Sequence, residues 1–213
     1  MKKLDKTKKQ KILKYSIVSL ELAGFLLIAY LVLLPFYPVF MYKFFNSNEI
    51  KPETEEIESI EVIKKETRDF RNAFPDADYS ISPNRLIISK IGVNAPIVES
   101  SNEQYGLSRG AWRVPESSTP DKGGNTVITG HRFKYLPPNN LTFYLFHELE
   151  VGDLVSVIWE EKDYFYKIKE TKIVPDTEIS IMDQTGEDIL TMFTCDPIYS
   201  TKNRLVIVAE PIN

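Results

Sequence analysis

The hydrophobic pattern is dominated by one long apolar run near the N-terminus. Residues Ile17 to Leu34 include a single charged side chain, Glu21. These 18 residues would extend ~27 Å as a helix, which is close to the thickness of the hydrocarbon layer of a membrane. Prolines and aromatic residues follow as far as Tyr42, as is typical of a helix end at a membrane interface. We therefore predict a transmembrane signal anchor over residues 15–42.

The charges on either side of this run predict its orientation. The first 14 residues carry seven lysines and one aspartate, whereas the segment after the run is rich in glutamate. Because positively charged flanks stay in the cytoplasm, residues 1–14 are predicted to be a cytoplasmic tail of a single-pass cell-membrane protein whose remaining chain is extracellular. A cleaved signal peptide is the alternative, but the run is longer than a signal-peptide core and no small-x-small cleavage site follows it.

Residues 43–78 form a polar, acidic linker. From Ile57 to Phe74 the apolar residues recur near helical spacing, and Glu61 with Lys65 makes a favourable i,i+4 pair. The pattern predicts either a helix that packs on the following domain or a simple stalk, and both interpretations stay open.

The pattern of residues 79–213 is that of an all-β domain. Short runs of β-branched and aromatic residues are separated by clusters of Gly, Pro, Asn and Asp, which predicts a sandwich or a barrel. One short helix is expected within Thr142–Glu150. The predicted strands are Arg85–Ser89, Ala95–Val98, Thr126–Thr129, Leu154–Trp159, Tyr164–Val174, Ile189–Thr194 and Leu205–Ala209.

Composition and charge exclude several classes of function. A net charge of -4 argues against a nucleic-acid binder, which normally has a basic domain. One cysteine in the whole chain excludes an internal disulfide framework and any CxxC-type metal or redox site. There is no P-loop, GxSxG or HExxH motif. Glu160, Glu161 and Asp163 are interpreted as a solvated turn rather than a metal site, so neither metal nor cofactor is predicted.

Three residues with catalytic chemistry lie at strand ends. His131 follows the strand that ends at Thr129, Cys195 follows the strand that ends at Thr194, and Arg204 opens the last strand. An eight-residue connection between Cys195 and Arg204 suggests adjacent strands that bring both residues to one edge of the sheet. Singly, each has an ordinary structural interpretation: a small buried thiol, a turn histidine and a surface cation.

Together, Cys, His and Arg suffice for acyl transfer. A thiolate attacks a peptide carbonyl, and a protonated imidazole gives its proton to the leaving amine. A guanidinium stabilises the oxyanion. His147 is expected to be a helix-surface residue rather than a second base.

At this point the sequence resembles the sortase family. Thr191-Met192-Phe193-Thr194-Cys195 resembles the signature TLxTC, Gly123 to Arg132 resembles the strand that delivers the catalytic His, and Thr201 to Val208 resembles the strand that carries the catalytic Arg. The three motifs occur in the family's order within residues 79–213, and the basic tail with its uncleaved anchor also looks like a sortase.

The resemblance implies an eight-stranded β-barrel and a cysteine transpeptidase of the cell surface. Cys195 would be the nucleophile, His131 the general acid and base, and Arg204 the ligand of the substrate carbonyl or oxyanion, while Thr194 would line the substrate groove. The implied substrates are surface proteins with a C-terminal LPxTG-like sorting signal. The implied acceptor is an amine of a peptidoglycan precursor or a pilin.

Two departures from the family pattern bear on subclass. Met192 replaces the usual Leu, a volume-conserving exchange that we expect to be tolerated. No Asp-Pro-aromatic lid stands out in the N-terminal part, and the Gly-His-Arg and Thr-Cys-Asp-Pro contexts are closer to classes D or E than to class A. Two other functions stay open: a surface cysteine peptidase that hydrolyses its substrate, and a non-catalytic anchored β-barrel that binds partners.

Overall fold

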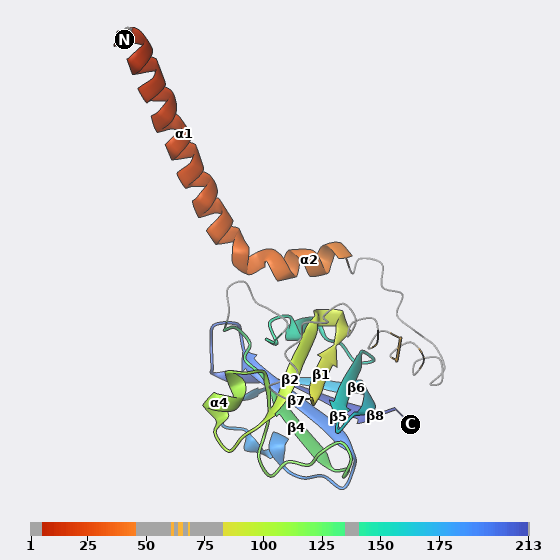
Figure 1. Ribbon diagram of the computed structural model, residues 1–213. Helices are drawn as coiled ribbons and strands as arrows, with labels where there is room; N and C mark the ends of the chain where they lie inside the picture. The colour runs from red at the N-terminus through yellow and green to blue at the C-terminus, as the bar shows by residue number, and fades with distance from the viewer. Residues whose placement is uncertain are drawn as a thin grey trace.

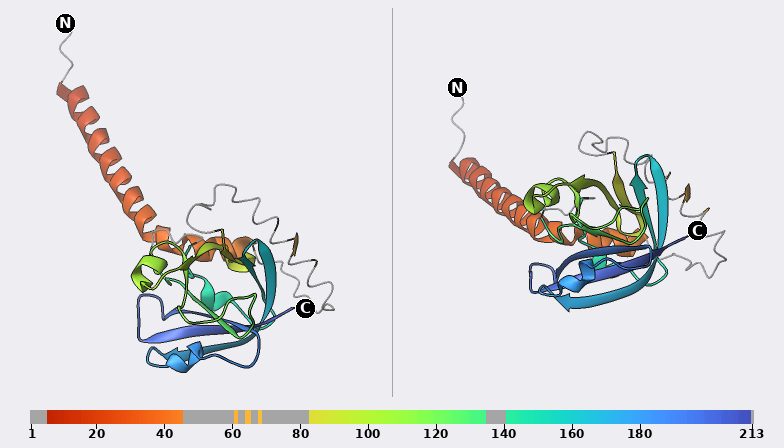
Figure 2. Two further views of the ribbon diagram at one scale, coloured as in Figure 1. Left: turned by 60° about the horizontal axis from the view of Figure 1, so that its bottom comes forward. Right: turned by 90° about the horizontal axis from the view of Figure 1, so that it is seen from below.

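The computed structural model describes residues 6–45, 83–134 and 141–212, together with Glu61, Lys64, Lys65 and Arg68. Eight strands close into a barrel in the order β1-β2-β3-β4-β7-β8-β6-β5, which confirms the expected all-β, eight-stranded architecture (Figures 1 and 2). The strands are β1 (Arg85–Ile88), β2 (Val93–Glu99), β3 (Ala111–Arg113), β4 (Asn125–Thr129), β5 (Leu154–Trp159), β6 (Lys162–Pro175), β7 (Ile189–Asp196) and β8 (Asn203–Pro211).

Short helices connect these strands. The helix expected within Thr142–Glu150 is the single turn η3 (Phe146–Glu148), and the other short helices of the barrel are η2 (Ser89–Ile91), α4 (Glu103–Leu107) and η4 (Ile179–Met182). Sequence analysis missed both α4 and β3. The signal for α4 was Asn102, whose side-chain oxygen accepts a hydrogen bond of 2.9 Å from the Tyr105 amide as an N-cap. β3 is only three residues long, too short for alternation to be visible.

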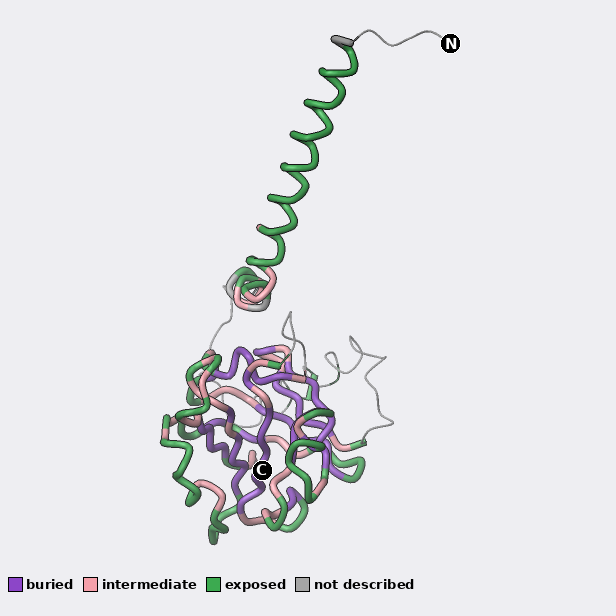
Figure 3. Tube along the Cα trace, turned by 90° about the vertical axis from the view of Figure 1, so that its left-hand side faces the viewer, coloured by how far each residue is buried: buried purple, intermediate pink, exposed green. Residues whose placement is uncertain are grey.

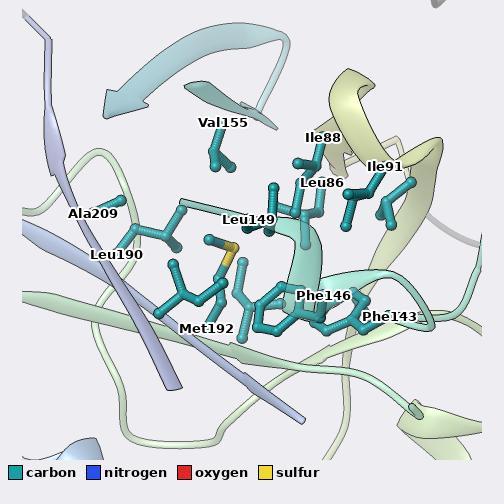
Figure 4. Packing of buried hydrophobic residues seen from close by; sticks show 14 of the residues in the cluster. Leu86, Ile88, Ile91, Phe143, Phe146, Leu149, Val155, Leu190, Met192 and Ala209 are labelled. Atoms are coloured by element: carbon teal, nitrogen blue, oxygen red, sulfur yellow. The ribbon is translucent and has the colours of Figure 1, made fainter. Parts of the chain in front are cut away.

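The barrel is filled by the inward-pointing residues of each strand. On β7, Leu190 and Met192 are fully buried, and Figure 4 shows Met192 among the side chains of Phe146, Leu149 and other core residues. The Leu-to-Met departure from the family signature therefore lies in the core, where the flexible thioether fills the available space. A second, small apolar cluster covers the outer face of β7 and β8 around Ile189, Val206 and Val208.

The acidic turn between β5 and β6 is a two-residue hairpin. Glu160 and Glu161 both have positive φ, 47° and 65°, as two-residue hairpin turns require. Both residues and Asp163 are exposed, which confirms the interpretation of this cluster as a solvated turn.

The N-terminal segment is a long exposed helix. α1 (Lys6–Leu33) runs into η1 (Leu34–Phe36) and α2 (Tyr37–Phe45), and Figure 3 shows α1 exposed along almost its whole length. The stretch Lys8–Phe36 is long and apolar enough to cross a membrane, and an 18-residue window within it has a mean hydropathy of 2.5. An apolar helix with no protein around it is compatible with a single-pass anchor. The prolines bend the chain but do not end the helical structure, because α2 follows them at an angle to α1 (Figure 1).

α2 lies between α1 and the barrel and contacts the barrel (Figures 1 and 3). The Tyr144 hydroxyl donates a hydrogen bond of 3.0 Å to the carbonyl oxygen of Pro35 in η1. Val39 and Tyr42 pack against the barrel core. The end of the anchor is therefore joined to the domain.

Two sequence-based predictions concern residues that are largely undescribed. The helix expected from Ile57 to Phe74 lies mostly outside the described residues, although Glu61, Lys64, Lys65 and Arg68 are helical. Glu61 pairs with Lys64 at 3.8 Å. The part of the chain in which no lid motif was found also falls largely outside the described residues, so that prediction stays untested.

Deleting residues 1–45 is expected to give a folded domain that needs no detergent. Beyond Phe44, the large apolar side chains exposed in the described residues are scattered: Tyr105, Val151, Ile173, Ile179 and Tyr199. A second variant that lacks residues 1–33 keeps α2 with its exposed Phe40 and Phe44, and it should bind lipid vesicles more strongly. Sedimentation with and without vesicles measures both. A detergent-dependent 1–45 deletion would show that apolar surface outside the anchor had been overlooked.

Candidate active site

Cys195 and Arg204 lie directly opposite each other on neighbouring strands. β7 and β8 are antiparallel, and Cys195 is the register partner of Arg204. Opposite residues of an antiparallel pair have side chains on the same face, with Cβ atoms about 4.5–5.5 Å apart. The Cys195 side chain is a free thiol of intermediate exposure. The structure thus brings together the thiol and the guanidinium-bearing residue that sequence analysis placed at one sheet edge.

The strand that leads to His131 lies on the other side of β7. β4 and β7 are parallel, and their register ends with Thr129 beside Phe193. Two residues further along both segments, the same register leads to His131 and Cys195. Within β7, Cys195 lies on the same face as Phe193, because side chains of a strand alternate with period two. His131 lies two residues beyond the end of β4.

Two threonine hydroxyls hold the chain between β4 and His131 against β7. Thr129 Oγ1 donates to the carbonyl oxygen of Phe193, and Thr194 Oγ1 donates to that of Gly130, each at 2.8 Å. Thr194 is 1% exposed, so its buried hydroxyl helps to fix the backbone just before His131. Its predicted place in the substrate groove stays a prediction.

Gly130 permits this close packing. A Cβ at this position would lie 2.9 Å from a ring carbon of Phe143, which is closer than real Cβ contacts. The Phe143 amide also donates a hydrogen bond of 2.9 Å to the His131 carbonyl oxygen. The backbone of His131 is therefore held from both sides.

The imidazole of His131 lies in a partly desolvated, mildly cationic setting. Burial lowers the pKa of His131, and the charge of Lys134 lowers it further, while Glu103 acts in the opposite direction. Desolvation favours the neutral imidazole because it penalises the charged form. The imidazole is therefore neutral over a wider range of pH than a free histidine.

Arg204 is held at the base of the loop that joins β7 to β8. Its Nη1 donates to the carbonyl oxygens of Thr201, at 2.8 Å, and Asn203, at 3.1 Å. Both bonds use one nitrogen of a group that carries five N–H donors. The loop thereby orients a cation on the face that also carries the thiol.

Comparison with known proteins agrees with this geometry. A family model described as "Sortase domain" matches residues 86–212, which is the barrel almost from end to end. The chain belongs to the sortase family. Members of this family are cysteine transpeptidases that act on surface proteins.

Individual relatives of this sortase are distant. Sortase A of Bacillus anthracis is 25% identical over 160 residues, which cover 75% of this chain and 73% of the relative. Sortase D of Bacillus subtilis (strain 168) is 33% identical over 113 residues, which cover 53% of each chain. The match therefore spans about half the length of the second relative.

Solved sortases share the fold. The structure of sortase A of Listeria monocytogenes has a TM-score of 0.55 and 25% identity over 61% of this chain and 86% of that chain. Sortase E1 from Streptomyces coelicolor, solved with a tripeptide in its active site, has a TM-score of 0.54 and 25% identity over 61% of this chain and 87% of that chain. These relatives carry the names of classes A, D and E, so the class D- or E-like assignment stays a prediction.

Sequence analysis missed a polar cluster beside these residues. Arg132 is 4% exposed, and its guanidinium contacts Asp196 and His147. The signal was adjacency, because Arg132 follows His131 and Asp196 follows Cys195. His147 lies in η3 with its side chain 40% exposed, which confirms the expected position on a helix surface.

Among the described residues, no group of three or more His, Cys, Asp or Glu side chains is placed to hold a metal ion.

Proposed function

We propose that this sortase is a membrane-anchored transpeptidase that cleaves an LPxTG-like sorting signal and transfers the resulting acyl group to an amine. The observation that supports the proposal is the register of three adjacent strands, which pairs Cys195 with Arg204 and sets the end of β4, two residues before His131, beside β7. Nucleophile, proton donor and oxyanion ligand are the parts that acyl transfer requires.

The reaction begins with the Cys195 thiolate. It attacks the carbonyl carbon of the threonine in the sorting signal, and the guanidinium of Arg204 stabilises the oxyanion. The tetrahedral intermediate collapses when the His131 imidazolium gives its proton to the leaving nitrogen. The C–N bond breaks, and a thioacyl enzyme remains with a neutral imidazole.

The second half reverses the proton transfer. An amine of a peptidoglycan precursor or a pilin attacks the thioester, and His131 accepts the proton that the amine loses. The C–S bond breaks, which restores the thiolate and the imidazolium. Surface proteins with a C-terminal sorting signal are the proposed donors.

The proposed location follows from the anchor. α1 crosses the membrane once with the lysine-rich tail in the cytoplasm, and the barrel lies outside. The hydrogen bond between Tyr144 and Pro35 would hold the barrel close to the membrane surface. A substrate with its own apolar span is presented there.

Product partition tests the proposal. The full-length protein in detergent is incubated with an LPxTG-like peptide, with and without an added amine. Transpeptidation predicts that the amine-linked product replaces the free acid as amine increases. Free acid alone would indicate a hydrolysing peptidase, and no cleavage together with an unreactive Cys195 would indicate a non-catalytic module.

The pH dependence of this reaction is expected to be bell-shaped, with its maximum below pH ~7.5. Free thiols and imidazoles ordinarily ionise near pH ~8.5 and ~6.5, so the thiolate–imidazolium form of such a pair peaks near pH ~7.5. The lowered pKa of His131 moves the maximum to lower pH, because the imidazolium is lost earlier as pH rises. Measuring kcat/KM from pH 5 to 9 checks this expectation.

Two charge variants test the direction in which the pKa of His131 shifts the pH maximum. Lys134→Gln removes a charge that lowers the pKa of His131 and should move the maximum to higher pH, whereas Glu103→Gln should move it to lower pH. A flat profile, or shifts of the same sign in both variants, would contradict a role for the His131 imidazolium.

A further inference from the structure

Arg132 is a buried cation between the two catalytic segments. It directly follows His131, and only 4% of it is exposed. Burying a guanidinium is costly unless it is paired and fully hydrogen-bonded. The contacts of this side chain therefore call for an explanation beyond packing.

The guanidinium joins three segments of the chain. Nη1 lies 3.6 Å from Oδ1 of Asp196, the residue after Cys195. Nη2 lies 3.0 Å from Nδ1 of His147 in η3. One side chain thus connects the segments that carry His131 and Cys195 and braces both against a third.

His147 is the neutral partner in this arrangement. Arginine has no acceptor, so Nδ1 of His147 must accept and the proton lies on Nε2, which is 3.4 Å from a carboxylate oxygen of Glu148. Burial lowers the pKa of His147, and the charge of Arg132 lowers it further. Glu148, a backbone hydrogen bond to Tyr144 and Asp196 act in the opposite direction, but the pKa is lowered overall, which favours the neutral ring.

The cluster lies behind the catalytic face. On β7, Thr194 points inward and Cys195 lies on the outer face, so alternation places Asp196 on the inner face. Arg132, the residue after His131, is buried with it. The pair therefore braces the wall of the barrel from the side opposite the thiol.

The pairing of Arg132 is incomplete. Its Nε and Nη1 have no hydrogen-bond partner within the described part of the chain, because 3.6 Å is too long for a hydrogen bond to Asp196. Buried donors without partners are rare and often mark functional sites. Burial lowers the pKa of Arg132, while the carboxylate of Asp196 acts in the opposite direction. Asp196 directly follows Cys195, so the cation lies beside the segment that carries the thiol.

We propose that Arg132 is a positioning residue of the active site, whose guanidinium clamps the segment after His131 to the segment after Cys195 and keeps a positive charge behind the thiol. This inference rests on the proposed function only for the measurements of kcat and KM that test it. Lysine at this position would keep the charge but lose the planar guanidinium, whose two terminal nitrogens reach Asp196 and His147 together.

The test compares Arg132→Lys and Arg132→Met in the full-length protein. Readouts are kcat and KM for an LPxTG-like peptide, the rate of Cys195 alkylation by iodoacetamide at fixed pH, and thermal unfolding. Both variants are expected to lower kcat by about 100-fold with KM little changed, since misplacement of reacting groups by ~1 Å costs about that much. Only Arg132→Met should slow the alkylation, because only that variant removes a positive charge beside the segment that carries the thiol.

Two variants of His147 provide a matched pair of tests if the Arg132 variants do not fold. His147→Gln keeps an acceptor for the guanidinium, whereas His147→Leu removes it, and both replace a half-exposed side chain. His147→Leu should lower kcat more than His147→Gln does. Equal kcat values in this pair would overturn the proposal.

The outcomes separate this proposal from the proposed function. Folded Arg132 variants with wild-type kcat and an unchanged alkylation rate would overturn the clamp, as would a loss of thermal stability alone. If the wild-type protein cleaves no sorting-signal peptide, the proposed function fails. The alkylation of Cys195 in the Arg132 variants then still decides whether Arg132 acts on Cys195.

Discussion

Replacing Cys195 with alanine is expected to abolish peptide cleavage while the barrel stays folded. The sequence holds one cysteine, so no second thiol can replace the nucleophile. Removal of a nucleophile from a comparable catalytic group costs on the order of 10⁶-fold in turnover. The Cys195 side chain is of intermediate exposure at the end of β7, where alanine leaves no core cavity. Cleavage assays and thermal unfolding of the variant measure the two effects separately.

Two controls sharpen this result. Cys195→Ser keeps the size of the side chain but replaces the thiol with a far weaker nucleophile, and it should be nearly as inactive. Thr191→Ser changes a residue of the same strand, on the outer face four positions earlier, and should leave turnover close to wild type. Cleavage by Cys195→Ala above a few per cent of wild type is incompatible with the enzyme assignment.

Replacing Arg204 with lysine is expected to lower turnover by about 100- to 1,000-fold although the charge is kept. This is the cost of losing one oxyanion donor in a well-studied protease. A guanidinium offers several donors in a fixed plane, whereas an ammonium is a compact and strongly hydrated point charge. Arg204 also holds the loop carbonyls of Thr201 and Asn203 through Nη1, and lysine cannot make those bonds and face the substrate together.

Arg113→Lys is the matched control. Arg113 lies in β3, where its largely buried guanidinium forms an ion pair of 2.5 Å with Glu99 and donates a hydrogen bond of 2.8 Å to the carbonyl oxygen of Ser117. Lysine cannot keep all of these contacts, so this variant should lose some stability but no turnover. A stably folded Arg204→Lys with normal turnover would remove Arg204 from the site and leave it as a surface residue at a strand start.

Local sequence patterns predicted most of the strands correctly. Leu154–Trp159 was predicted with the bounds of β5, and Ile189–Thr194 lies within β7, because alternation and turn residues act between near neighbours. β3 was missed since three residues show no period. α1 begins at Lys6, within the predicted cytoplasmic tail, because a lysine-rich flank continues a helix as easily as it ends a membrane span.

Part of the candidate site was also predictable. The short connection between Cys195 and Arg204 indicates a hairpin-like return, and the structure pairs these residues directly. The role proposed for Arg132 was not predictable, although this residue ends the motif Gly123 to Arg132. Its partners Asp196 and His147 are distant in sequence, and its burial depends on the closure of the barrel around them.

By itself, the sequence determined the apolar N-terminal helix, the all-β character of the domain and, through short motifs, the family, and it named three residues for the predicted site. These properties depend on composition, on periods of two residues and on short motifs, all of which lie in contiguous stretches of chain. The tertiary structure alone decided that β4 runs parallel to β7, that two threonine hydroxyls hold the segment before His131 against β7, and that Arg132 is buried. The reason is physical: β4 and β7 are about 60 residues apart in the chain, and such pairings form only when burial of the shared core offsets the entropy of closing the intervening loop.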